Sequence, residues 1–144
     1  IVQEVTDGLK PVANSTGKRL VLRASTAHAT AAVDAVRMAQ SIQNIVSNAI
    51  KYSPANSGIT ISTCENAGHI EILVRNKGKL AEADAERAFS RFTRLDNEIT
   101  RGTPGTGLGL SITREILDEM GGTITLMSDQ KCIEARIRVP ILAQ

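Results

Sequence analysis

The sequence predicts an α+β domain, a two-layer sandwich with helices packed on one face of a mixed sheet. Helix-like and strand-like segments are mixed along the 144 residues, but they do not alternate as strict β–α–β units. Several neighbouring strand-like segments are joined by turns too short for a crossover helix, so these strands should pair antiparallel. Hydrophobic residues make up 42% of the chain, enough for the core of one domain.

Helical periodicity accounts for four segments, over residues 1–15, 35–52, 84–94 and 108–120. The apolar face of the first comprises Val2, Val5, Leu9 and Val12, and that of the second runs from Val36 to Ile50. Asp34 is suited to cap the second helix, and Pro54 to stop it. Gly121 and Gly122 are suited to end the last one.

Alternating or β-branched segments predict five strands, over residues 19–24, 58–63, 69–75, 123–127 and 132–139. The stretch Asn66-Ala67-Gly68 is typical of a turn between the second and third strands. Residues 95–106 are polar, contain Gly and Pro, and predict a mobile loop.

Composition excludes several functions. The net charge is +2, from 17 basic and 15 acidic residues, so no nucleic-acid partner is expected. No apolar run approaches the ~20 residues of a membrane-spanning helix. Cys64 and Cys132 lack metal-ligand spacing and are expected to be buried free thiols. The chain begins with Ile1, so we expect a domain cut from a longer protein.

Residues 102–112 read GTPGTGLGLSI and lead directly into a helical pattern. Glycines before a helix expose backbone N–H groups, and the helix dipole adds partial positive charge, which together suit an anion. The stretch lacks the GxxxxGK[ST] pattern and is not preceded by a strand, so it matches neither common nucleotide loop. On its own it fits a phosphate site and a flexible hinge equally well.

A second polar cluster lies on the predicted helix over residues 35–52. Asn44, Asn48 and Lys51 are spaced i, i+4 and i+7, which places them on one helix face. This face could simply be exposed to solvent. Alternatively, carboxamide oxygens suit Mg²⁺ and a lysine suits phosphate.

Three motifs in order resemble those of the ATP-binding catalytic domain of bacterial sensor histidine kinases. NIVSNAIKYS resembles the N box of that family, RAFSRFTRLD the F box and GTGLGLSI the G2 box. The resemblance covers nearly the whole chain, from Ile1 to Pro140. It implies the Bergerat (GHKL) fold, a mixed sheet under a helical layer with a flexible ATP lid.

The resemblance also implies roles for individual residues. Asn48 would coordinate Mg²⁺ between the ATP phosphates, and Asn44 would line the same region. Lys51 would contact phosphate, and Arg94 would reach the γ-phosphate from the F box. Tyr52 would lie near the adenine or ribose, or else pack at the helix end.

The glycine-rich stretch supplies the remaining phosphate contacts that the resemblance implies. These ATP-binding residues are Gly105, Thr106, Gly107, Leu108, Gly109 and Leu110. The glycines would let the backbone wrap the phosphates, and the leucines would pack below. Phe89 and Phe92 are interpreted as packing residues that anchor the base of the lid.

The G1 box departs from the family pattern Asp-x-Gly-x-Gly. Asn76 stands where the family has an adenine-binding Asp, Gly78 and the aliphatic Leu80 are kept, and the second glycine is missing. An Asn carbonyl can accept a hydrogen bond from adenine, but without charge assistance. Charged hydrogen bonds contribute about 1.5–3 kcal/mol and neutral ones about 0.5–1.5 kcal/mol. The expected loss is about 1 kcal/mol, or about five- to tenfold in affinity.

Two functions therefore stay open. The first is a working kinase domain that binds ATP with Mg²⁺ and phosphorylates a histidine on a separate dimerisation domain of a homodimeric parent, which then serves a response regulator or phosphotransfer protein. The second is a degenerate domain that acts as a regulatory protein-interaction module. Gyrase-like hydrolysis is disfavoured, because Asn44 stands where those relatives have a general-base Glu. The domain is expected to be cytoplasmic, whether its parent is membrane-anchored or soluble.

Overall fold

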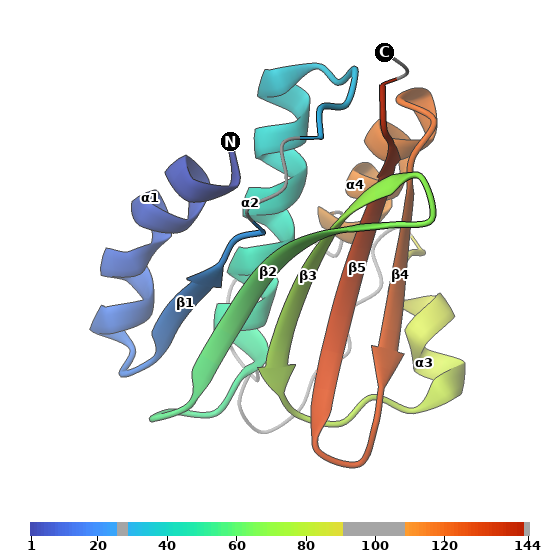
Figure 1. Cartoon of the computed structure of the whole chain (residues 1–144). Helices are drawn as coiled ribbons and strands as arrows, with labels where there is room; N and C mark the ends of the chain where they lie inside the picture. The colour runs from blue at the N-terminus through green and yellow to red at the C-terminus, as the bar shows by residue number, and fades with distance from the viewer. Residues whose placement is uncertain (26–28, 91–108, 143–144) are drawn as a thin grey trace.

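A computed structural model describes residues 1–25, 29–90 and 109–142. The elements follow the chain in the order α1 (Val2–Ser15), β1 (Arg19–Arg23), α2 (Ala35–Tyr52), β2 (Gly58–Asn66), β3 (His69–Lys77), α3 (Glu82–Arg87), α4 (Gly109–Glu119), β4 (Thr123–Ser128) and β5 (Cys132–Pro140). Helices α1, α2 and α4 lie behind a twisted sheet, so the predicted α+β sandwich is confirmed (Figure 1).

The sheet is mixed, with strand order β1-β2-β3-β5-β4. β1 and β2 are parallel because α2 connects them as a crossover, whereas the other neighbours pair antiparallel. β2 continues to Asn66 and β3 to Lys77, beyond the predicted ends. The hairpin turn between them needs only Ala67 and Gly68, which both have positive φ angles, of 49° and 77°.

The core lies between the sheet and the three long helices. Its largest fully buried aliphatic side chains are Ile42 and Val46 of α2, Ile59 and Ile61 of β2, Val74 of β3, Leu117 of α4 and Ile137 of β5. Gly122, directly after α4, allows a close approach to β5, because a Cβ atom there would lie 2.6 Å from the carbonyl oxygen of Arg138.

Two predicted core positions are wrong. Val12 is 50% exposed and Val36 is 79% exposed. On α1 the buried stripe runs through Thr6, Leu9 and Ala13, so Val12 points away from the sheet. Val36 lies in the first turn of α2, before Met38, the first buried residue of that helix.

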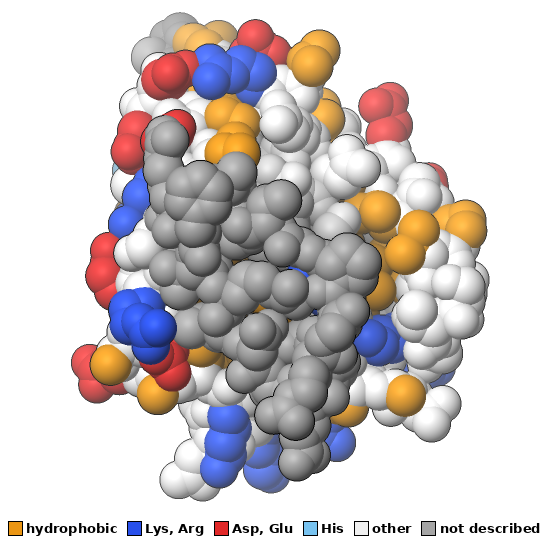
Figure 2. All heavy atoms as spheres, turned by 180° about the vertical axis from the view of Figure 1, so that it is seen from behind, with side chains coloured by type: hydrophobic (Ala, Val, Ile, Leu, Met, Phe, Trp, Pro, Cys, Tyr) orange, Lys and Arg blue, Asp and Glu red, His pale blue; other side chains and the backbone are white. Residues whose placement is uncertain are grey.

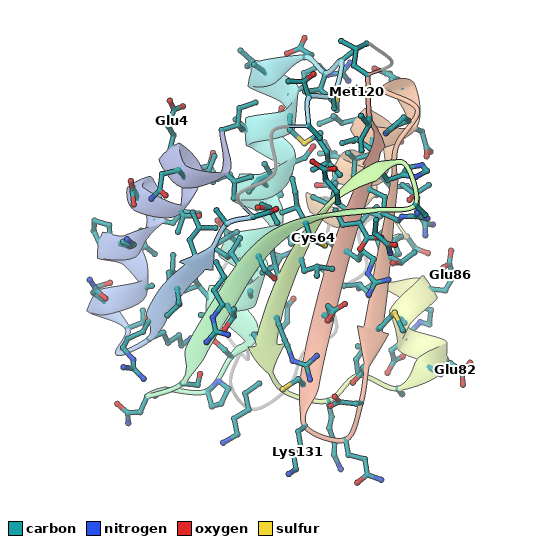
Figure 3. All side chains as sticks on the ribbon, in the orientation of Figure 1. Glu4, Cys64, Glu82, Glu86, Met120 and Lys131 are labelled. Carbon is teal, nitrogen blue, oxygen red and sulfur yellow. The ribbon has the colours of Figure 1, made fainter. Side chains whose placement is uncertain are left out.

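The shorter elements and the cysteines also differ in part from expectation. α3 begins two residues earlier than predicted and ends at Arg87. Cys64 and Cys132 are free, as predicted, but both are half-buried rather than buried. Cys64 lies on a strand at the open face of the sheet (Figure 3), where burial and nearby Glu71 raise the pKa of its thiol. Among the described residues, no helix is both long enough and apolar enough to cross a membrane.

Candidate functional site

The predicted site residues that the structure describes come from α2, the end of β3 and the start of α4. The carboxyl-terminal ends of α2 and β3 lie at the same end of the molecule (Figure 1). α2 contacts both β3 and α4 directly. The fold therefore brings together segments that are more than 20 residues apart in the sequence.

Asn44 connects α2 to the first turn of α4. Its Nδ2 atom donates to the hydroxyl of Thr113 at 3.2 Å and to the carbonyl of Gly109 at 3.5 Å. The Thr113 hydroxyl in turn donates to the same Gly109 carbonyl at 2.9 Å. These bonds use the amide nitrogen of Asn44, so only its carboxamide oxygen would be available to a metal or to water. The role of Asn44 toward phosphate and metal stays a prediction.

The last two turns of α2 present the other three predicted residues of this helix. Asn48, Lys51 and Tyr52 are all half-buried. The Lys51 ammonium lies over the Tyr52 ring, 5.7 Å from its centroid, which is within cation–π range. This contact lies at the helix end, and a ligand contact of the Tyr52 ring stays a prediction.

Asn76, the residue at the adenine position of the resemblance, is buried at the end of β3, with 6% of its surface exposed. Its Nδ2 atom donates to the carbonyl of the next residue, Lys77, at 3.1 Å. The amide nitrogen is thus used within the strand, and the carboxamide oxygen keeps its capacity to accept a hydrogen bond.

Gly78 and Leu80 are held by the β4–β5 hairpin. The Gly78 N–H donates to the Lys131 carbonyl at 2.9 Å, and the Leu80 N–H donates to the Ser128 hydroxyl at 3.0 Å. Gly78 has a φ of +154°, which side-chain-bearing residues rarely adopt, and a Cβ atom there would lie 3.2 Å from Ile133 Cδ1. The glycine is therefore required by the local backbone.

Asp129 organises that hairpin, and sequence reasoning missed its contribution. Its carboxylate accepts the backbone N–H groups of Lys131 and Cys132, both at 2.7 Å, and pairs with Arg75 at 3.0 Å. The two backbone donors, and then Arg75, hold the pKa of the carboxyl below its usual value. An Asp at the start of a turn is the signal that could have identified it.

Phe89 is buried, which confirms its interpretation as a packing residue. The Arg114 guanidinium lies over its ring at 3.9 Å from the centroid and pairs with Glu86 at 2.9 Å. This hydrogen bond and charge lower the pKa of Glu86. The three side chains tie α4 to the segment that ends α3.

The other predicted site residues divide into two groups. Gly109 and Leu110 form the start of α4 and are half-buried. Outside the described residues lie Phe92, Arg94, Gly105, Thr106, Gly107, Leu108 and the predicted mobile lid over residues 95–106.

The end of the molecule that carries Asn76 is basic. Lys77, Lys79 and Lys131 are exposed there, at the end of β3 and in the β4–β5 turn. Lys131 marks that end in Figure 3, and basic side chains gather along the same lower edge in Figure 2. Positive charge beside a site raises the local concentration of an anionic ligand.

Comparisons with known proteins identify the domain. The family model for histidine kinase-, DNA gyrase B- and HSP90-like ATPases matches residues 33–142. Sensor protein VanS of Enterococcus faecium is 32% identical over 139 residues, which cover 96% of this chain and 36% of VanS. The sensor-like histidine kinase SenX3 of Mycolicibacterium smegmatis is 46% identical over 88 residues, which cover 60% of this chain and 23% of SenX3.

Among solved structures, the nucleotide-free catalytic domain of histidine kinase ThkA superposes with a TM-score of 0.84 at 27% identity. The match covers 96% of this chain and 89% of that domain. In contrast, the chain spans only 23% of SenX3 and 36% of VanS. The chain therefore belongs to the family of histidine kinase-, DNA gyrase B- and HSP90-like ATPases, as an ATP-binding catalytic domain of the sensor histidine kinase type.

Proposed function

We propose that residues 1–144 form one catalytic domain that binds ATP with Mg²⁺ and donates the γ-phosphoryl group to a histidine on a separate domain of its parent chain. The observation that carries the proposal is the junction between α2 and α4. There Asn44 bonds to the first turn of α4, one helical turn before Asn48. The helix face that carries Asn44, Asn48 and Lys51 would thus present its oxygen and ammonium groups toward a helix N-terminus, where anions are stabilised.

The described residues fit a magnesium ion that is held chiefly by phosphate. No group of three or more His, Cys, Asp or Glu side chains within the described ranges is arranged to hold a metal. Mg²⁺ commonly keeps several waters and takes only one or two protein ligands beside the phosphates of its substrate. The carboxamide oxygen of Asn48 would supply a protein ligand here.

Each residue of the site then has a limited task. Lys51 would contribute a positive charge to the phosphates, and the N-terminus of α4 would contribute backbone N–H groups and its dipole. Asn76 would accept a hydrogen bond from the adenine amino group through its oxygen. Bound Mg-ATP would supply the phosphoryl group, and the protein would act by positioning and charge stabilisation.

The proposal also assigns contacts with the same phosphates to five further residues, which are Arg94, Gly105, Thr106, Gly107 and Leu108. The proposal includes two partners. One is the phosphoacceptor and dimerisation domain of a homodimeric parent, and the other is a response regulator or phosphotransfer protein. A response regulator is reached on the cytoplasmic side of a membrane, so the proposal places the domain there.

A second candidate function is a regulatory module with weak or no nucleotide binding. The observation that favours it is the G1 region, where Asn76 replaces a charged acceptor and uses its own amide nitrogen on Lys77. The missing glycine shortens the same segment. The domain would then act by binding another protein.

Titration calorimetry with a non-hydrolysable ATP analogue, with and without Mg²⁺, tests the proposal. We expect binding in the micromolar range that requires Mg²⁺. A folded sample that releases no heat at millimolar nucleotide would overturn it and favour the regulatory module.

A further inference from the structure

Lys18, between α1 and β1, is an unusual residue because its side chain is buried. Only 7% of its surface is exposed, whereas lysines are almost never buried without a partner. Its Nζ atom donates to the main-chain carbonyl of Ile50, in the last turn of α2. Within the described part of the chain, no carboxylate pairs with it.

The turn between α1 and β1 is also hydrogen-bonded to the loop that follows α2. The Asn56 N–H donates to the Gly17 carbonyl at 3.0 Å, and the Arg19 N–H donates to the Ser57 carbonyl at 3.2 Å. With the Lys18 contact, three hydrogen bonds join the α1–β1 turn to this region, one to the last turn of α2 and two to the loop that follows it. They connect residues that are more than 30 positions apart in the sequence.

Lys18 acts as a cap at the end of α2. The last four carbonyls of a helix lack partners within the helix, and a cation is favourable beside them. The Ile50 carbonyl accepts both from Lys18 and from the fully buried Ser53 hydroxyl, the latter at 3.2 Å. Ile50 stands between Asn48 and Lys51, so this cap holds the turn that presents both side chains.

Stability alone does not account for a lysine at this position. Burial lowers the pKa of the Lys18 ammonium, which means that the fold disfavours its charge. An ammonium taken out of water loses hydration, and a neutral carbonyl returns less of that free energy than an opposite charge would. The charge is therefore better explained by its contact with α2 than by packing.

We propose that Lys18 is a positioning residue for the nucleotide site, because its ammonium fixes the last turn of α2 and with it Asn48, Lys51 and Tyr52. The proposal rests on the proposed function of the domain. It predicts that removal of the ammonium weakens nucleotide binding even where the overall stability of the domain is kept.

The test compares Lys18→Met with Asp34→Ala, a control at the opposite end of the same helix. Asp34 caps the start of α2 by accepting the Arg37 N–H at 3.0 Å, so Asp34→Ala should lower the melting temperature. We expect Lys18→Met to bind the ATP analogue with Mg²⁺ about five- to tenfold more weakly, through lost preorganisation. Asp34→Ala should stay within about twofold of the wild type, and Lys18→Arg, which restores a cation, should recover part of the loss.

Amide hydrogen exchange of residues 48–53 gives a readout that does not need nucleotide. Exchange in this turn should be faster in Lys18→Met than in Asp34→Ala. Wild-type affinity in Lys18→Met, or an equal loss in both variants, would overturn the positioning role. A wild type that binds no nucleotide would instead overturn the proposed function and the positioning role together, and the exchange data would still report whether the cap exists.

Discussion

The two halves of the candidate site are built in different ways. The proposed phosphate side lies on α2, a helix of 18 residues whose opposite face is buried from Met38 to Ile50. The proposed base side lies where β3 ends, on a short segment that Lys131 and Ser128 hold from the β4–β5 hairpin. By the resemblance, the first half keeps the residues of the family motif, whereas in the second half Asn76 stands in place of a charged residue and one glycine is missing.

This difference indicates which half tolerates change. Side chains on a regular helix keep their direction as long as its buried face is packed, so Asn44 and Asn48 are specified locally. The position of Asn76 and Gly78 depends instead on a neighbouring hairpin. We therefore expect substitutions on α2 to act on nucleotide contacts, and substitutions near Gly78 to act first on local structure.

The largest effect is expected on the phosphate side. Asn48→Ala should weaken Mg-dependent binding of an ATP analogue by at least the ~10- to 100-fold that loss of an outer-shell residue costs a metal site, because the proposed metal-coordinating oxygen is removed. Binding without Mg²⁺ should change much less, and calorimetry in both conditions measures the two values. Gln43→Ala, which removes an exposed carboxamide from the same helix, is the matched control. Equal losses with and without Mg²⁺ would remove the metal role from Asn48.

On the base side, Gly78→Ala should lower the free energy of unfolding by about 1–2 kcal/mol. The backbone at φ +154° is strained for alanine, and the new Cβ would contact Ile133. Urea unfolding measures the change. Gly8→Ala is the matched control, since Gly8 lies within α1 with open space around it and should gain about 0.5–1 kcal/mol. An unchanged stability in Gly78→Ala would show that this segment adapts freely.

Asn76→Asp tests whether the base side has lost only its charge. If the pocket is otherwise intact, affinity for the ATP analogue should rise about five- to tenfold, or about 1 kcal/mol. The new carboxylate cannot donate to the Lys77 carbonyl as the amide does, so unfolding must be measured beside binding. Asn14→Asp, on the exposed side of α1, adds the same charge away from the site. No gain at equal stability would mean that the shortened segment has closed or displaced the pocket.

The sequence predicts helix α2 well because its signals are local. The i, i+4, i+7 spacing places Asn44, Asn48 and Lys51 on one face, and Asp34 caps the helix as expected. The fold class follows in the same way from short turns and alternating strands. The errors at Val12 and Val36 arise because periodicity identifies an apolar stripe, whereas the sheet decides which part of it is covered.

The remaining features depend on contacts between distant segments. The bond from Gly78 to Lys131 requires the β3–β5 pairing, and the bond from Lys18 to Ile50 requires the packing of α1 and β1 against α2. Lys18 has no local pattern that distinguishes it from an exposed lysine. Sequence reasoning therefore predicted both strands of the β4–β5 hairpin but not their contacts with the segment around Gly78.

The smallest effect concerns the Asp129 carboxylate, which organises the hairpin behind Gly78. Its folded-state pKa is lowered by the Lys131 and Cys132 N–H groups and by Arg75. Its contribution to stability should therefore be present above the unfolded-state pKa of about 3.8 and be lost as the pH falls through the lower folded-state value. Asp129→Asn should unfold at less urea than the wild type at pH ~7, with the difference shrinking below pH ~3.8. Asp118→Asn, on the exposed surface of α4, controls for net charge. A difference that persists unchanged in acid would assign the stabilisation to the shape of the Asp129 side chain. The hairpin that holds Gly78 would then not depend on the charge of Asp129.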